Sequence, residues 1–212
     1  VAVLAVVALL GYLIWSGYRE AIQAAETTTR DYAAILEARL DATLRRVDAD
    51  LQELSRTIPV AALRQQAVPR YNGALMAQLN SRLSGFPEMA DFVVTDATGE
   101  RIYTTAGVGM ARLNIAGFSY FGTLRDNPQA GLVISEVLAS RSRQQPIVVV
   151  ARALRDAQGV FRGIVFGTIK LDGFEKLFQS LDVGAHGTIS WRRTDDQRLV
   201  LRWPHLAEAV NK

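Results

Sequence analysis

The spacing of apolar residues predicts a long helix at the start of the chain. Residues 1–18 contain no charged side chain, and further apolar positions then recur in steps of three or four. This spacing forms one stripe along a helix, and Pro59 cannot continue it. We therefore expect one helix up to Thr57, whose stripe meets a second copy or packs on its own domain. The stripe comprises Tyr32, Leu36, Leu40, Leu44, Val47, Leu51, Leu54 and Ile58.

Residues 1–18 are also predicted to cross a membrane. As a helix they extend about 27 Å, close to the hydrocarbon thickness of a bilayer. Tyr12, Trp15 and Tyr18 gather at the end of the run, where aromatic rings favour the headgroup level. The alternative is a signal peptide, but the run is long and lacks a small-residue cleavage site. Because no initiator Met is present, we expect the sequence to begin inside a longer protein.

The middle of the chain predicts an antiparallel sheet. Two sequences of turn-forming residues, 96–99 and 156–159, each end in glycine and each separate two strand-like runs. A helix ended by Pro128 and a middle strand lie between these hairpins. A further helix, for which Asn72 is a candidate cap, is expected to cover the same face as the long helix. The strands are expected at residues 92–95, 101–105, 131–139, 147–154 and 160–171, and the two shorter helices at 72–83 and 117–128.

The last forty residues repeat part of this pattern. Asp172 is expected to cap a helix that runs to Leu181 and ends at Gly184. Residues 188–203 then give a second strand, turn and strand. This hairpin starts a second module that is truncated here, or it adds two strands to a single module.

Composition excludes several classes of function. The 212 residues carry a net charge of +3 and no cysteine, so a disulfide scaffold, a Cys-based zinc site and c-type haem are excluded. The arginines are scattered, whereas nucleic-acid binding needs a clustered basic surface. His186 and His205 have no partner at metal-ligand spacing. We therefore predict no enzymatic activity, no cofactor, no metal and no nucleic-acid partner.

The order of these elements resembles the double Cache (dCache) family of PAS-like extracytoplasmic sensor domains, over residues 18–203. The similar features are Tyr120-Phe121, Arg125-Asp126-Asn127-Pro128, the strand at 131–136, Ser140-Arg141-Ser142, and Leu171-Asp172-Gly173-Phe174. The resemblance implies an α+β fold with a five-stranded antiparallel sheet and flanking helices. It also implies a division into a transmembrane helix (1–18), a stalk helix (19–58), a distal Cache module (59–171) and the start of a proximal module (172–212).

The resemblance further implies a small-molecule pocket between the sheet and the helix at 117–128. The residues that it maps there are Tyr120, Phe121, Arg125, Asp126, Ser135, Ser140, Arg141 and Lys170. Two observations oppose this assignment. Tyr120 and Phe121 are adjacent on a helix and are not expected both to face the core, and Arg125 and Asp126 alternatively tie down the helix end.

The family's amino-acid-binding members suggest the ligand class. They use an Arg followed closely by Trp-Tyr and an Asp near the end of the last strand. Here the Trp-Tyr is missing, and Lys170 or Ile169 lies near the Asp position. A cation there repels an ammonium group, which argues against an α-amino acid. Arg125, Arg141 and Lys170 favour a carboxylate or another small anion, provided that they converge.

The resulting hypothesis is a ligand-sensing input domain of a transmembrane receptor, with the sensor on the periplasmic side of the inner membrane. We expect a homodimer through the stalk helix and a diguanylate cyclase as output, with a histidine kinase or chemoreceptor as alternatives. The competing hypothesis is a ligand-free module for dimerisation or protein docking.

Overall fold

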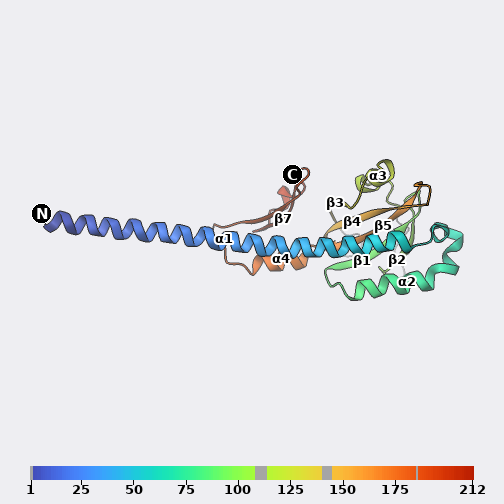
Figure 1. Cartoon of the computed structure of the whole chain (residues 1–212), viewed down its shortest axis with the longest axis horizontal. Coiled ribbons are helices and arrows are strands. Elements are labelled where there is room, and N and C mark those ends of the chain that lie inside the picture. Colours follow the sequence, from blue (N-terminus) through green and yellow to red (C-terminus); the bar gives the residue numbers. More distant parts are fainter. Residues whose placement is uncertain (1, 108–113, 140–144, 185) are drawn as a thin grey trace. The chain divides into compact units, whose positions relative to one another are not determined.

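The computed structural model describes residues 2–107, 114–139, 145–184 and 186–212 (Figure 1). The chain forms two compact units, Val1–Leu44 and Arg45–Lys212. The long helix, α1 (Ala2–Thr57), is continuous through both units and ends just before Pro59, which confirms the helix predicted from the apolar stripe. Within the part of the chain that the structure describes, no helix is long and apolar enough to cross a membrane.

Two short 3₁₀ helices and α2 follow α1. The 3₁₀ helices are Val60–Leu63 and Gln65–Ala67, and α2 is Val68–Ser84. The helix predicted at 72–83 therefore begins earlier than expected, and Asn72 lies inside it rather than at its cap. Pro69 explains the difference, because proline is tolerated in the first turn of a helix, where its missing N–H is not needed.

The five predicted strands form one antiparallel sheet in the order β2-β1-β5-β4-β3. The two tight turns have the predicted chemistry: the side chain of Asp96 accepts backbone N–H bonds from Thr98 and Glu100, and Gly99 has a φ of 81°. Asp156 does the same before Gly159. The strands are β1 (Met89–Thr95), β2 (Arg101–Thr104), β3 (Val133–Ala139), β4 (Pro146–Arg155) and β5 (Phe161–Lys170).

One face of the sheet is covered by α2 and by the part of α1 that follows Leu44. Val47, Leu51 and Leu54 of α1 are fully buried, as is Leu79 of α2. Charged groups fix this packing. Asp48 accepts two hydrogen bonds from Arg152 of β4, at 2.6 and 3.0 Å, and Asp50 forms an ion pair with Arg82 of α2. The helix is thus tied to both the sheet and its neighbouring helix.

The C-terminal segment contains α4 (Asp172–Gln179) and a separate two-stranded sheet of β6 (Ile189–Arg192) and β7 (Leu199–Trp203), followed by the 3₁₀ helix Ala207–Ala209. The predicted hairpin is confirmed. The predicted bounds of α4 differ from the observed ones. Asp172 is not the cap residue but follows it: the cap is Leu171, and Asp172 lies in the first turn without a capping bond. The helix ends before Gly184, whose φ of 76° belongs to the following loop.

Candidate functional site

The helix α3 (Ser119–Asp126) covers the face of the sheet opposite α2 (Figure 1). Tyr120, Phe121 and Leu124 are only 4%, 1% and 0% exposed. The rings of Tyr120 and Phe166 lie 6.2 Å apart, and those of Phe121 and Phe161 lie 5.5 Å apart. The expectation that Tyr120 and Phe121 are not both in the core was therefore wrong. The buried stripe of a helix is more than about 100° wide, so it accommodates two adjacent residues when the contact is broad.

The sheet beneath α3 is apolar along one row of cross-strand neighbours. Val93 of β1 pairs with Phe166 of β5, which pairs with Ala151 of β4, which pairs with Val133 of β3. All four belong to the hydrophobic cluster around α3 or pack against it. These residues fill the layer between sheet and helix and hold α3 in place.

The next row on the same face contains two polar residues on β1 and β5 and then Val149 of β4, which belongs to the hydrophobic cluster. Side chains alternate between faces along a strand, so Asp91, two residues before Val93, and Thr168, two residues after Phe166, share the face that α3 covers. Asp91 and Thr168 are direct cross-strand partners. Thr168 is 5% exposed, and the Oδ1 atom of Asp91 is buried. Lys170 follows on the same face, opposite Ile147. A carboxylate, a hydroxyl and an ammonium group therefore gather at one end of this face.

The sequence prediction included Lys170 but missed Asp91 and Thr168. The signal was present, since counting back by two from Val93 and forward by two from Phe166 reaches both residues. Asp91 was missed because the strand predicted at residues 92–95 began after it, whereas β1 begins at Met89. Thr168 lay within the strand predicted at 160–171 but was not assigned to a face of the sheet.

Ser135 has a structural role in β3. Its hydroxyl accepts a hydrogen bond from the backbone N–H of Val149 at 2.9 Å and donates one to the carbonyl of Glu136 at 2.6 Å. These bonds lie at a break in the register between β3 and β4. The hydroxyl thus satisfies a backbone donor where the strand ladder is interrupted.

Arg125 and Asp126 lie at the exposed end of α3 and pair with each other. The guanidinium donates two hydrogen bonds to the carboxylate, at 2.7 and 3.1 Å. The bond from Arg125 lowers the pKa of Asp126. The structure places this pair at the surface rather than among the buried side chains beneath α3. Ser140 and Arg141, also predicted for the pocket, lie outside the described residues.

Arg155 of β4, which the sequence prediction did not include, holds the C-terminal end of α3. Its Nη2 atom donates to the carbonyl of Leu124 at 2.6 Å, and its Nη1 atom donates to the carbonyl of Gly159 at 3.2 Å. The guanidinium also lies 5.5 Å from the ring centroid of Phe161. A cation at the C-terminus of a helix is favoured by the exposed carbonyls and the helix dipole. Nothing local in the sequence links Arg155 to Leu124.

We expect Arg155→Met to loosen α3 without unfolding the sheet. A hydrogen bond to a charged group contributes about 1.5–3 kcal/mol, so amide hydrogens in the last turn of α3 should exchange at least tenfold faster. Arg162→Met is the matched control, because Arg162 lies in the same hairpin but pairs with Asp156 at its surface. Equal rates of amide hydrogen exchange in the last turn of α3 in both variants would contradict this role of Arg155.

No protein-family model matches the sequence, and no curated protein matches it. Among solved structures, the chain is similar to the extracellular domain of the putative histidine kinase rpHK1S-Z16, with 26% identity and a TM-score of 0.69, over 82% of this chain and 69% of that one. It is also similar to the ligand-binding domain of the Campylobacter jejuni chemoreceptor Tlp3 in complex with L-valine (9% identity, TM-score 0.63, 87% of this chain and 72% of that one).

A third similar structure is the ligand-binding domain of the Pseudomonas aeruginosa amino acid chemoreceptor PctC in complex with GABA. It shares 15% identity and a TM-score of 0.59, over 88% of this chain and 75% of that one. The chain therefore has the Cache-like, PAS-type fold of extracellular sensor domains, as its resemblance to dCache domains predicted.

Proposed function

We propose that this chain is the extracytoplasmic input domain of a membrane-anchored receptor and senses a small molecule at the polar end of the sheet face that α3 covers. The observation that carries the proposal is the pair of polar residues Asp91 and Thr168, which lies on one face between the apolar Val149 and the strand β2 edge, next to the apolar row from Val93 to Val133. A ligand site typically combines apolar walls with a few convergent polar groups. The Cache-like fold supports sensing rather than catalysis.

The proposed ligand is a carboxylate or another small anion. Lys170 supplies the positive charge, and Thr168 supplies a hydroxyl that donates or accepts. The Thr168 hydroxyl also accepts a hydrogen bond, which favours a ligand that carries a donor as well. Arg125 contributes less than the sequence suggested, because Asp126 already occupies its guanidinium.

Thermal-shift screening tests this proposal. The panel contains mono- and dicarboxylates, hydroxycarboxylates, inorganic phosphate and the free α-amino acids. We expect carboxylates to raise the melting temperature, with the largest rise for those that carry a hydroxyl, and we expect Lys170→Met to abolish the rise. Lys176→Met is the control, because Lys176 is an exposed residue of α4 and its loss removes the same charge. A rise caused by a free α-amino acid and unchanged in Lys170→Met would contradict the proposed ligand class.

A ligand-free docking or dimerisation module is the second candidate. The observation that favours it is the filled layer under α3, where aromatic side chains already contact the sheet. The screen distinguishes the two candidates, because a module of this second kind is stabilised by no member of the panel.

We further propose that residues 1–18 anchor the receptor in the inner membrane and that α1 meets a second copy beyond them. At the end of this segment the guanidinium of Arg19 lies 4.3 Å from the ring centroid of Trp15, an arrangement suited to the headgroup level. Disulfide crosslinking of Ala25→Cys in membranes, with Glu26→Cys as control, tests the dimer; equal crosslinking of both would exclude it.

The output domain is proposed from the resemblance alone. Sensors of this type occur on membrane-bound diguanylate cyclases, which we take as the first candidate, and the similarity to the histidine kinase domain supports a kinase as the alternative.

We also propose that the β6–β7 hairpin begins a second PAS-like module. The sequence of the protein beyond Lys212 tests both proposals.

A further inference from the structure

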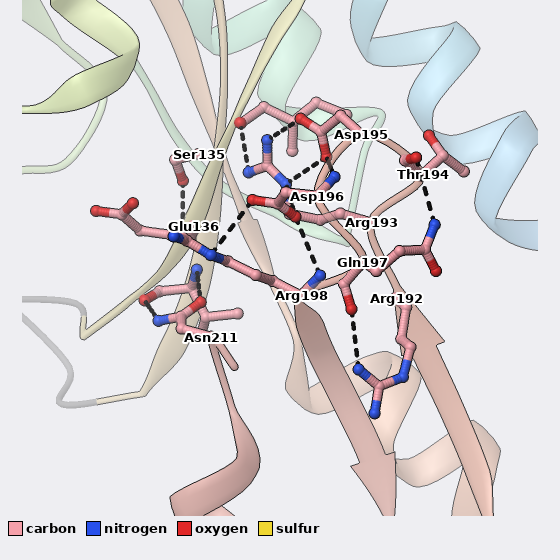
Figure 2. Close-up of polar contacts among 12 residues, drawn as sticks. Ser135, Glu136, Arg192, Arg193, Thr194, Asp195, Asp196, Gln197, Arg198 and Asn211 are labelled. Atoms are coloured by element: carbon pink, nitrogen blue, oxygen red, sulfur yellow. Dashed lines mark hydrogen bonds and ion pairs between the residues drawn. The ribbon is translucent and has the colours of Figure 1, made fainter.

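The outer edge of β3 is bound by side chains from the C-terminal segment instead of by another strand. In the described part of the chain, β3 is the last strand of its sheet. The carbonyl of Ile134 accepts a hydrogen bond from Nη1 of Arg193 at 2.9 Å (Figure 2). The side-chain amide of Asn211 binds both backbone groups of Val137: its Oδ1 accepts from the N–H and its Nδ2 donates to the carbonyl, each at 2.9 Å. The side-chain amide therefore makes the two hydrogen bonds that one residue of a neighbouring antiparallel strand would make.

These contacts lie on either side of a β-bulge. The register between β3 and β4 shifts between Ile134 and Val137, and the hydroxyl of Ser135 binds the backbone of Val149 on the inner edge. Bulges bend a strand and increase its local twist. Three side chains, Ser135 on one edge and Arg193 and Asn211 on the other, therefore bind the backbone of β3 at this bulge.

Both outer contacts come from the same end of the β6–β7 hairpin. Arg193 directly follows β6, and its backbone N–H donates to the carbonyl of Arg198 at 2.9 Å. The backbone N–H of Asn211 donates to the carbonyl of Leu199, the first residue of β7, also at 2.9 Å. The two side chains are thus carried on one hydrogen-bonded unit.

Arg193 is held in place by two carboxylates. Its guanidinium pairs with Asp195, and its Nε lies 3.3 Å from Asp196 (Figure 2). The hydrogen bond from Arg193 lowers the pKa of Asp195 to about 2, so this pair is charged on both sides at neutral pH. The Arg193 side chain is only 18% exposed. A paired, largely covered guanidinium of this kind has little freedom to leave the carbonyl of Ile134.

We propose that Arg193 and Asn211 form a two-point clamp that makes the bend of β3 and the position of the β6–β7 hairpin change together. The other end of this connection is the layer under α3, because Val133 and Leu138, on either side of the bulge, pack against its hydrophobic cluster. A change in that layer therefore reaches the hairpin through β3. The clamp itself follows from the contacts at the strand edge; its use in signalling rests on the proposed sensory function.

The substitution Asn211→Asp tests the clamp with minimal change of shape. Aspartate keeps the acceptor for the N–H of Val137 but places an oxygen against its carbonyl, where Asn211 had a donor. Both residue types tolerate the positive φ of 65° at this position. Asn127→Asp is the matched control, since the hydrogen bond that the structure describes for this side chain is one that its Oδ1 atom accepts from the N–H of Gln129. The native chain has no cysteine, so spin labels at Asn80→Cys on α2 and Thr194→Cys in the hairpin turn report the position of the hairpin.

We expect a single narrow distance distribution for the unmutated clamp and for Asn127→Asp, and a broadened or shifted one for Asn211→Asp. The amide of Val137 should exchange about tenfold faster in Asn211→Asp, while the amides of the β1–β5 pair are unchanged. Arg193→Met removes the other contact and should broaden the same distribution. Narrow distributions with unchanged Val137 exchange in both variants would overturn the proposal. Global loss of protection, including the β1–β5 pair, would also overturn it, because it would assign these residues to overall stability rather than to a local clamp.

No ligand is added in this experiment. If the variants shift the distance distribution but no ligand raises the melting temperature, the clamp stands and only the sensory proposal is refuted. If a ligand raises the melting temperature but the variants leave the distance distribution unchanged, only the clamp is refuted.

Discussion

Replacing Phe121 with alanine is expected to lower the free energy of unfolding by about 3–5 kcal/mol, the usual cost of deleting a buried phenylalanine ring. The ring is almost fully buried, makes an edge contact with Phe161, and belongs to the cluster that joins α3 to the sheet. This cluster and the hydrogen bond from Arg155 hold α3 on the sheet, and we expect the cavity to relax only partly.

Urea denaturation measures this effect, and Phe118→Ala provides the control. Phe118 is half-buried at the edge of the same cluster, so its loss should cost clearly less than that of Phe121. Equal costs, or a cost below about 1 kcal/mol for Phe121→Ala, would show that α3 does not depend on this ring.

The second large effect is expected for Asp48→Asn, which breaks the pair between α1 and the sheet. The Asp48 and Arg152 side chains are 34% and 21% exposed, so the pair lies between a surface ion pair, worth about 0–1 kcal/mol, and a buried one, whose disruption costs about 3–5 kcal/mol. We expect a loss of about 2 kcal/mol, mainly because Arg152 keeps its charge without a full partner.

Two comparisons make this prediction specific. Glu53→Gln removes the same charge from an exposed position of the same helix and should change stability by less than about 0.5 kcal/mol. The double variant Asp48→Asn with Arg152→Met should recover part of the loss, because an apolar side chain of similar length needs no partner. If the double variant is less stable than Asp48→Asn alone, the cost does not come from the unpaired guanidinium.

The strands and turns were predictable because their signals are local. Alternating apolar residues and an aspartate three residues before a glycine determine a hairpin within about ten residues. The long helix was predictable for the same reason, since its stripe and Pro59 are both read along the chain. Helix starts were less predictable: α2 begins near Pro69 and α4 begins without a capping bond from Asp172, because tertiary packing outweighs the modest energy of a cap.

The candidate site was predicted only in part. Tyr120, Phe121 and Lys170 were placed on the face of the sheet that α3 covers, although the first two serve as core residues. Thr168 and Asp91 are adjacent only because β1 pairs with β5 in one particular register. Arg155, Arg193 and Asn211 act through backbone carbonyls and amides far away in sequence, and such contacts leave no pattern in the chain itself.

Calorimetric titration of the carboxylate with the largest thermal shift tests the central claim most directly, when it is compared between the unmutated chain, Thr168→Val and Thr123→Val. Valine is close in shape to threonine but lacks the hydroxyl, and Thr123 is an exposed residue of α3 that serves as the control. The account predicts saturable binding at one site per chain, weakened at least about tenfold by Thr168→Val and unchanged by Thr123→Val, as expected for loss of a buried hydrogen bond. Saturable binding of equal strength in all three proteins, or no saturable binding by any member of the panel, would contradict a ligand site at the polar end of this sheet face.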